Sequence, residues 1–140
     1  MSTARRLAKF NVEQLLAPHP PRTNLYVANL DGRFGLRIAQ IRDTFPAHRH
    51  PNGDEGWFIY RGRLRIDSEI GSVELSQGEG VVLPRGVRHS PTCLEDGTIV
   101  LVMNARDLAT VPDDAGALTA SGYTEVDAHG PLAGEPEVTR

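Results

Sequence analysis

The sequence predicts an all-β domain, an antiparallel sandwich or barrel, on three observations. Short runs rich in β-branched and aromatic residues alternate apolar with polar positions through the middle of the chain. Glycine and proline, with 14 and 10 residues, separate these runs at close spacing, as turns between many short strands require. The length of 140 residues fits one domain with its own core. A single cysteine, Cys93, excludes an internal disulfide.

The chain divides into three segments. Residues 1–23 are expected to form an N-terminal arm with one short helix, whose helical spacing rests on Leu7, Phe10, Leu15 and Leu16. Residues 24–106 are expected to form the β domain. Residues 107–140 lose periodicity, so we expect a C-terminal extension that is partly disordered, with Tyr123 and Val126 as the side chains that dock.

Seven runs within the central segment have the two-residue period or the β-branched composition of strands. Each is bounded by a glycine, a proline or polar turn residues. The runs cover residues 25–28, 34–38, 57–60, 63–67, 73–75, 81–83 and 99–103.

Charge and hydropathy exclude several function classes. The net charge of −3 and the pI near 5.9, with both signs interspersed, argue against nucleic acid as the main partner. No stretch of about 18 apolar residues exists, so no transmembrane helix is expected. The first residues lack the apolar core of a secretion signal, and we therefore expect a cytoplasmic protein.

Two histidines two residues apart form the strongest chemical feature. In a strand, residues i and i+2 point to the same face, so the imidazoles of His48 and His50 can converge on one ion. A turn at residues 51–53 can return Glu55 beside them, and His89 can join from a distant strand. Imidazole and carboxylate ligands suit Fe, Mn, Ni, Co, Cu or Zn better than Ca or Mg. We therefore predict one divalent transition metal.

The same residues stand in two spaced motifs. The pattern H-x-H-x4-E-x6-G is met by His48, His50, Glu55 and Gly62, and the pattern G-x5-P-x-G-x2-H by Gly78, Pro84, Gly86 and His89. In these two motifs the chain resembles the cupin superfamily. The resemblance implies a double-stranded antiparallel β-helix, or jelly-roll barrel, with His48, His50, Glu55 and His89 as metal ligands. It also implies a homodimer.

Two positions depart from the family pattern, and the motif spacing also decides between two adjacent acidic residues. Arg42 stands where the first motif usually opens with glycine, and Cys93 stands where an asparagine usually follows the second motif. The spacing to Gly62 selects Glu55 rather than Asp54 as the ligand.

Strand parity suggests the residues that line a substrate pocket. Trp57 and Ile59 lie an even number of residues from Glu55, and Cys93 lies an even number from His89, so each would point to the same face of its strand as that ligand. Packing in the core would also explain all three positions. Phe45 and Tyr60 are further candidates. A group of arginines falls on the opposite faces and is expected to be solvated: Arg49, Arg61, Arg63 and Arg65.

Two functions of different classes remain open. The first is a metal-dependent enzyme, such as a dioxygenase, isomerase or decarboxylase, acting on a small organic acid or sugar derivative. The second is a non-catalytic barrel that binds or senses a small molecule and holds a structural metal. A barrel that keeps these polar residues without binding any metal is the simplest alternative to both. Fold does not decide among them, because one barrel hosts many chemistries.

Overall fold

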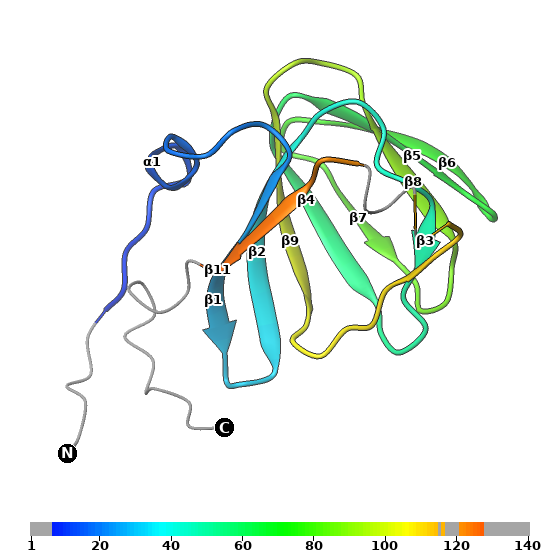
Figure 1. Cartoon of the computed structure of the whole chain (residues 1–140), viewed down its shortest axis with the longest axis horizontal. Coiled ribbons are helices and arrows are strands. Elements are labelled where there is room, and N and C mark those ends of the chain that lie inside the picture. Colours follow the sequence, from blue (N-terminus) through cyan, green and yellow to red (C-terminus); the bar gives the residue numbers. More distant parts are fainter. Residues whose placement is uncertain (1–6, 115, 117–120, 128–140) are drawn as a thin grey trace.

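The computed structural model describes residues 7–114, 116 and 121–127, and these form one short helix and eleven strands (Figure 1). The all-β class predicted from the sequence is confirmed. Among the described residues, no helix is long and apolar enough to cross a membrane. The disorder expected toward the C-terminus falls on residues 128–140, which lie outside the described residues.

The larger sheet has six strands, and four of its five neighbouring pairs are antiparallel. Its order is β11 (Thr124–Asp127), β1 (Thr23–Leu30), β2 (Phe34–Ile41), β9 (Thr98–Ala105), β4 (Glu55–Arg61) and β7 (Gly80–Leu83). Only β11 and β1 run parallel, so the sheet is not the purely antiparallel one that the sequence predicted.

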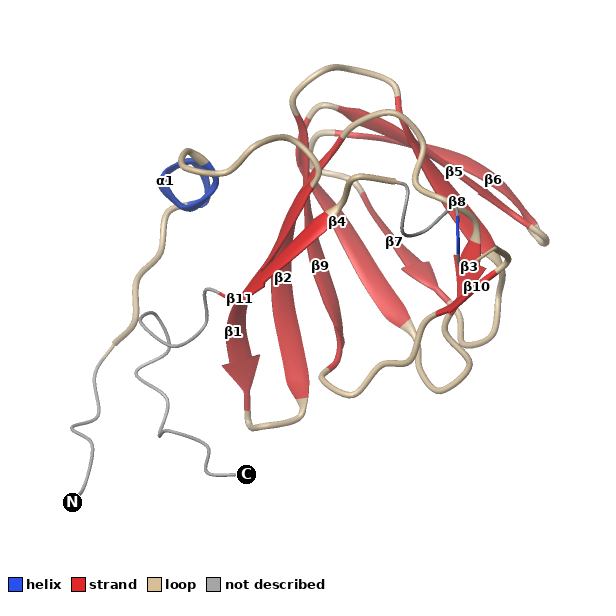
Figure 2. Cartoon of the chain, in the orientation of Figure 1, coloured by secondary structure: helices blue, strands red, loops and turns tan. Residues whose placement is uncertain are grey.

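The smaller sheet has five strands, and it faces the larger one (Figure 2). Its order is β10 (Val111–Pro112), β3 (His48–Arg49), β8 (His89–Cys93), β5 (Arg63–Ser68) and β6 (Gly71–Ser76). The short strands β10 and β11 lie in the segment that the sequence analysis treated as aperiodic. Both pair through their backbones and bury little, so no apolar alternation marks them.

The main core lies between the two sheets. Alternate residues of β4 point into it, with Trp57 and Ile59 buried while Phe58 and Tyr60 are exposed. Both sheets contribute to this core, which contains Ala39, Ile41, Trp57, Ile59, Leu64, Ile66, Leu75, Leu83, Val100 and Val102. Glu55 has the same parity as Trp57, and therefore also points inward.

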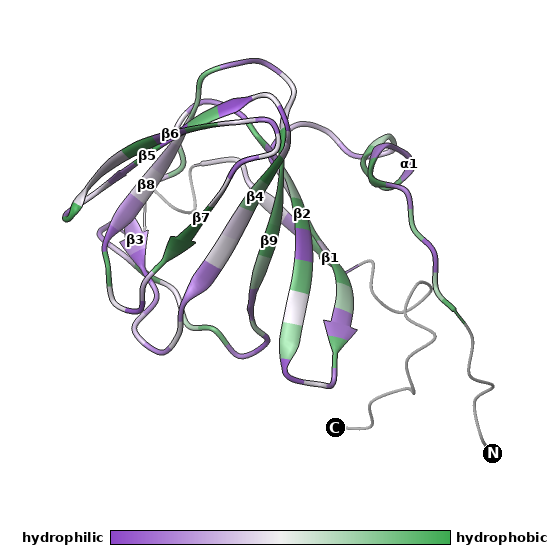
Figure 3. Ribbon diagram, turned by 180° about the vertical axis from the view of Figure 1, so that it is seen from behind, coloured by the Kyte–Doolittle hydropathy of each residue, from purple (hydrophilic) through white to green (hydrophobic). Residues whose placement is uncertain are grey.

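A second cluster covers part of the outer face of the larger sheet. The helix α1 (Val12–Leu16), capped by Asn11, buries Leu16 against residues of β1, β2 and β9. Elsewhere on this outer face, Phe58, Val82 and Met103 are exposed at 47%, 67% and 52% among the described residues. Figure 3 shows the hydrophobic residues that run along β7 and β9.

The motif glycine Gly62 makes the tight turn between β4 and β5. Its φ of +95° favours glycine, and a Cβ there would lie 2.3 Å from the Thr98 Oγ1 and 2.7 Å from the Thr98 Cα. This turn aligns β4, which carries Glu55, with β5 of the opposite sheet.

Candidate metal centre

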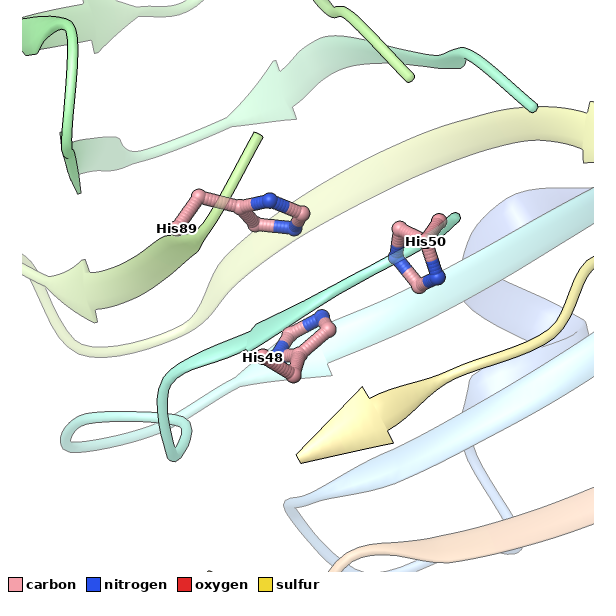
Figure 4. Close-up of side chains that lie close together, drawn as sticks. All are labelled: His48, His50 and His89. Atoms are coloured by element: carbon pink, nitrogen blue, oxygen red, sulfur yellow. The ribbon is translucent and has the colours of Figure 1, made fainter. Parts of the chain in front are cut away.

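Three histidines converge at one end of the space between the sheets. His48 and His89 are direct partners across the β3–β8 pair, and His50 follows β3 immediately. Their ligand atoms all lie within 4.8 Å of one another, and Figure 4 shows the three rings turned toward a common point. All three side chains are buried. These three histidines could therefore hold a metal ion.

The carboxylate of Glu55 reaches the same point from the opposite sheet. Its Oε1 lies 3.5 Å from the Nε2 of His50 and 3.9 Å from the Nε2 of His89. These separations are electrostatic contacts rather than well-formed hydrogen bonds. Glu55 is the first residue of β4, where the chain returns after the turn that the sequence analysis placed at residues 51–53.

Backbone carbonyls fix the orientation of each imidazole. The Nδ1 atoms of His48, His50 and His89 lie 2.8, 3.0 and 2.9 Å from the carbonyl oxygens of Pro46, Ala109 and Val87. A carbonyl can only accept, so Nδ1 carries the proton and Nε2 presents its lone pair. Within the described part of the chain, the buried Nε2 atoms of His50 and His89 have no hydrogen-bond partner. Buried lone pairs without partners are costly, and a metal ion would satisfy them.

Two neighbours hold the Glu55 carboxylate in place. The Trp57 indole N–H donates to Oε1 at 2.6 Å, and the Asn104 amide donates to Oε2 at 2.9 Å. Asn104 is the direct partner of Glu55 across the β4–β9 pair. Such supporting donors orient metal-binding carboxylates in other proteins.

The protonation states suit a cation. Burial by itself would raise the pKa of Glu55, but the adjacent His50 and the donors Asn104 and Trp57 outweigh it and hold this pKa at about 2. Burial lowers the pKa of His48 to about 4 and also lowers that of His89. For His50, burial opposes protonation, yet the Glu55 carboxylate raises its pKa. Near neutral pH the site therefore combines an anionic carboxylate with neutral imidazoles at His48 and His89, which suits a divalent metal.

A cavity of about 290 Å³ opens beside these residues. Aromatic and aliphatic side chains form about half of its wall, and polar groups form the rest. The cavity is lined by Asn24, Arg37, Ala39, Ile41, Phe45, His48, His50, Glu55, Trp57, Val102, Asn104, Leu108, Thr110, Tyr123 and Glu125.

Of the three residues proposed for the substrate pocket, only one lines the cavity. Trp57 lines the cavity, but Ile59 and Cys93 do not. Ile59 is fully buried in the main core. Cys93 is half-buried against that core, and its thiol donates to the Glu95 carbonyl. Strand alternation put these side chains on the inward face, where they pack with the main core and do not line the cavity. Of the further candidates, Phe45 lines the cavity and Tyr60 is exposed.

Several cavity residues were not assigned to a pocket from the sequence, among them Arg37, Asn104 and Tyr123. Asn104 lies an even number of residues from the buried Val100 and Val102, so the alternation along β9 could have predicted its inward position. Tyr123 was expected to dock, and it does pack against the main core, but nothing local marks it as a cavity residue; it reaches the cavity from the segment before β11. The arginines expected on the solvated faces do lie there, and Arg61, Arg63 and Arg65 pair with surface carboxylates.

A model of the cupin domain family matches residues 36–105, which is half of the chain. The chain belongs to the cupin family. A solved cupin-2 domain containing protein from Shewanella frigidimarina shares the fold, with a TM-score of 0.63, 20% identity and coverage of 69% of this chain and 94% of that one. This confirms the family that the two motifs indicated.

Three further proteins resemble this chain, and two of them have named activities. The hydroquinone 1,2-dioxygenase PnpCD, solved with Cd²⁺ and 4-hydroxybenzonitrile, has a TM-score of 0.60 at 15% identity, over 84% of this cupin and 75% of that chain. The polyketide synthase CurC of Streptomyces cyaneus is 27% identical over 90 residues, or 64% of this cupin. Protein SchB of Streptomyces halstedii is 27% identical over 82 residues, or 59%. The matches span only 58% and 59% of the length of these two proteins.

Proposed function

We propose that this cupin binds one divalent transition metal through His48, His50, Glu55 and His89 and uses it in an enzyme reaction on a small organic acid. The observation that carries the proposal is the fixed tautomer of all three imidazoles, together with the buried, unpartnered Nε2 atoms of His50 and His89 close to the Glu55 carboxylate. The donor set suits Fe, Mn, Ni, Co, Cu or Zn.

The cavity supports chemistry that depends on the metal rather than on a separate acid–base residue. When bound, such a metal supplies Lewis-acid or oxygen-activating chemistry. Apart from the four proposed ligands, the ionisable residues that line the cavity are Arg37, Tyr123 and Glu125. The Tyr123 hydroxyl donates to the Arg42 carbonyl, and burial raises its pKa. Glu125 has a side chain that is 73% exposed, at the solvent edge.

The wall of the cavity favours a compact, partly aromatic substrate over a sugar derivative. Phe45, Trp57 and Tyr123 provide aromatic surface, whereas sugars need many hydrogen-bonding groups. A volume of about 290 Å³ is close to the lower end of small-molecule sites. The relatives named as a polyketide synthase and a hydroquinone dioxygenase support the same class of substrate. Among the reactions expected from the sequence, we therefore propose a dioxygenase first.

Oxygen uptake tests this function. The cupin, loaded in turn with Fe²⁺, Mn²⁺, Co²⁺, Ni²⁺, Cu²⁺ or Zn²⁺, is mixed with phenolic and enolic acids while dissolved oxygen and substrate are followed. We expect uptake with at least one redox-active metal. His50→Gln should abolish it, and His19→Gln, outside the cluster, should not. Turnover without oxygen uptake would indicate an isomerase or decarboxylase. Binding without turnover would indicate the non-catalytic barrel.

Three further expectations from the sequence stay proposals. We propose that the two sheets form the jelly-roll barrel of the family and that the protein is cytoplasmic. We also propose a homodimer, supported by the exposed apolar side chains Phe58, Val82 and Met103 on the outer face of the larger sheet. Light scattering of the purified protein measures the mass directly, and a monomer at micromolar concentration would contradict the dimer.

A further inference from the structure

One cation in the cavity wall has almost no partner in the protein. Arg37 lies on β2 with the inward parity of Ala39 and Ile41, and its side chain is only 21% exposed. Within the described part of the chain its guanidinium makes no hydrogen bond. Its contacts are the ring of Tyr26, 5.1 Å from the guanidinium carbon, and a carboxylate oxygen of Glu125 at 3.9 Å.

These two contacts leave most of the recognition capacity of Arg37 unused. A guanidinium carries five N–H donors in a planar fork that matches a carboxylate. The Glu125 oxygen lies beyond hydrogen-bond distance, and its side chain is 73% exposed on the edge strand β11. Ion pairs with one exposed partner contribute little, because water competes for that partner. An anion inside the cavity would fill the free donors.

A second polar group lies close to Arg37. Asn24 on β1 is the register partner of Ala39, two residues from Arg37 on the same face of the sheet. Asn24 lines the cavity, and its buried Oδ1 has no partner among the described residues. The wall at β1 and β2 therefore presents a cation and an unsatisfied amide, and the cavity lining also includes the aromatic rings of Phe45, Trp57 and Tyr123.

We propose that Arg37 is the residue that selects the substrate, by binding its carboxylate in a bidentate contact. The cavity then takes a compact organic anion whose apolar body lies against Phe45 and Trp57. Glu125 acts as an internal counterion that the substrate carboxylate displaces. This inference rests on the proposed function, because it treats the cavity as the substrate site.

Benzoate and benzamide test the charge preference, because they share shape and differ in charge. Trp57 is the only tryptophan of the chain and lines the cavity, so its indole N–H resonance reports on binding there. Each ligand is titrated into metal-free and zinc-loaded protein. We expect benzoate to bind about tenfold more tightly than benzamide in both forms, because charge-assisted hydrogen bonds are roughly twice as strong as neutral ones.

Three variants connect this preference to Arg37. In the metal-free protein, Arg37→Gln should remove the preference for benzoate, with both ligands binding alike. Glu125→Gln should strengthen benzoate binding several-fold, because the competing carboxylate is gone. Arg49→Gln makes the same change of charge at an exposed residue of β3, and should leave the preference unchanged. An unchanged preference in Arg37→Gln, or weaker benzoate binding in Glu125→Gln, would overturn the inference.

The same samples separate this inference from the metal function. Metal content is measured for each variant, and Arg37→Gln should retain the metal stoichiometry of the native protein. An Arg37-dependent preference in a protein that takes up no metal would support the anion site and refute the metal-dependent function. A metal-loaded, active protein without the preference would refute the anion site alone. Glu125 is exposed at a sheet edge, so Glu125→Gln gives a result even if Arg37→Gln fails to fold.

Discussion

His48 and His89 face each other as direct cross-strand partners of β3 and β8, with ring centroids 4.5 Å apart. Backbone pairing therefore sets the separation of two proposed ligands independently of any ion. Their Nδ1 atoms are held by the carbonyls of Pro46 and Val87, each two residues earlier in the chain. The same local contact therefore orients both imidazoles, and the fold sets the direction of their Nε2 lone pairs without any ion.

The stability of the metal-free protein should fall as the pH falls below 6.5. The pKa of His48 is about 4 when folded and 6.5 as a free side chain, so the unfolded chain takes up a proton first. The native state loses up to about 3 kcal/mol from this residue between pH 6.5 and 4, since each pKa unit corresponds to about 1.4 kcal/mol. The measurement is urea unfolding across this range. His48→Gln should flatten the dependence, and a native protein equally stable at pH 6.5 and 4 would contradict the burial of a neutral His48.

Removing the support of Glu55 should weaken metal binding without removing a ligand. Asn104→Leu deletes the amide that donates to Glu55 Oε2 and leaves that oxygen buried and unpaired. We expect metal affinity to fall about 10- to 100-fold, as for other groups that orient ligands. Competition with a chelating dye measures the affinity. Met103→Leu, on the adjacent outward-facing position, serves as the control, and equal affinities of the two variants would argue against this role of Asn104.

Two of the three motif glycines, Gly62 and Gly78, should differ in their tolerance of alanine. Gly62→Ala places a Cβ against the backbone and side chain of Thr98, whereas Gly78→Ala meets nothing within 4 Å. Both positions have positive φ, so both variants carry the strain of about 1 kcal/mol or more expected for alanine there. Gly62→Ala should lose roughly 2 kcal/mol more, as overpacked sites do. Thermal unfolding ranks the variants, and similar melting temperatures would show that the Thr98 contact relaxes freely.

Metal should stabilise the folded protein by mass action. At a free metal concentration 100 times Kd, the free energy of unfolding should rise by about 2.7 kcal/mol, provided that the unfolded chain does not bind the metal. Calorimetry with and without metal measures this rise. Glu55→Gln keeps the size of the side chain but removes its charge, so its rise should be much smaller. A rise as large as that of the native protein would show that Glu55 is not a ligand.

Spaced motifs and strand alternation predicted much of the fold and the set of converging residues. The alternation of β4 placed Glu55 and Trp57 on one face, and the structure puts both inward. Alternation did not find Arg37, because both faces of β2 are partly buried. Ile38 faces the cluster under α1, so the charged residue beside it is the one that faces the cavity. The two-residue alternation of a strand assigns its side chains to two faces, but it does not tell which of these faces points into the interior of the domain.

Other features depend on contacts between distant segments, which local patterns do not encode. Ala109 holds the ring of His50 from 59 residues away, through a carbonyl that every residue possesses. Tyr123 enters the cavity wall because β11 joins the edge of the larger sheet beside β1. Neither position carries a residue type or spacing that identifies its role. The extent of the cavity, which excludes Ile59 and Cys93, likewise emerges only when both sheets are packed.

Metal stoichiometry tests the central claim most directly. The native protein and the His48→Gln/His89→Gln double variant are incubated at neutral pH with each of the six candidate metals. After desalting, their metal content is measured by plasma mass spectrometry, with His19→Gln as the control. We predict one metal ion per chain in the native protein and the control, and none in the double variant. A native protein that retains no metal, or a double variant that retains as much as the native protein, would contradict the metal centre.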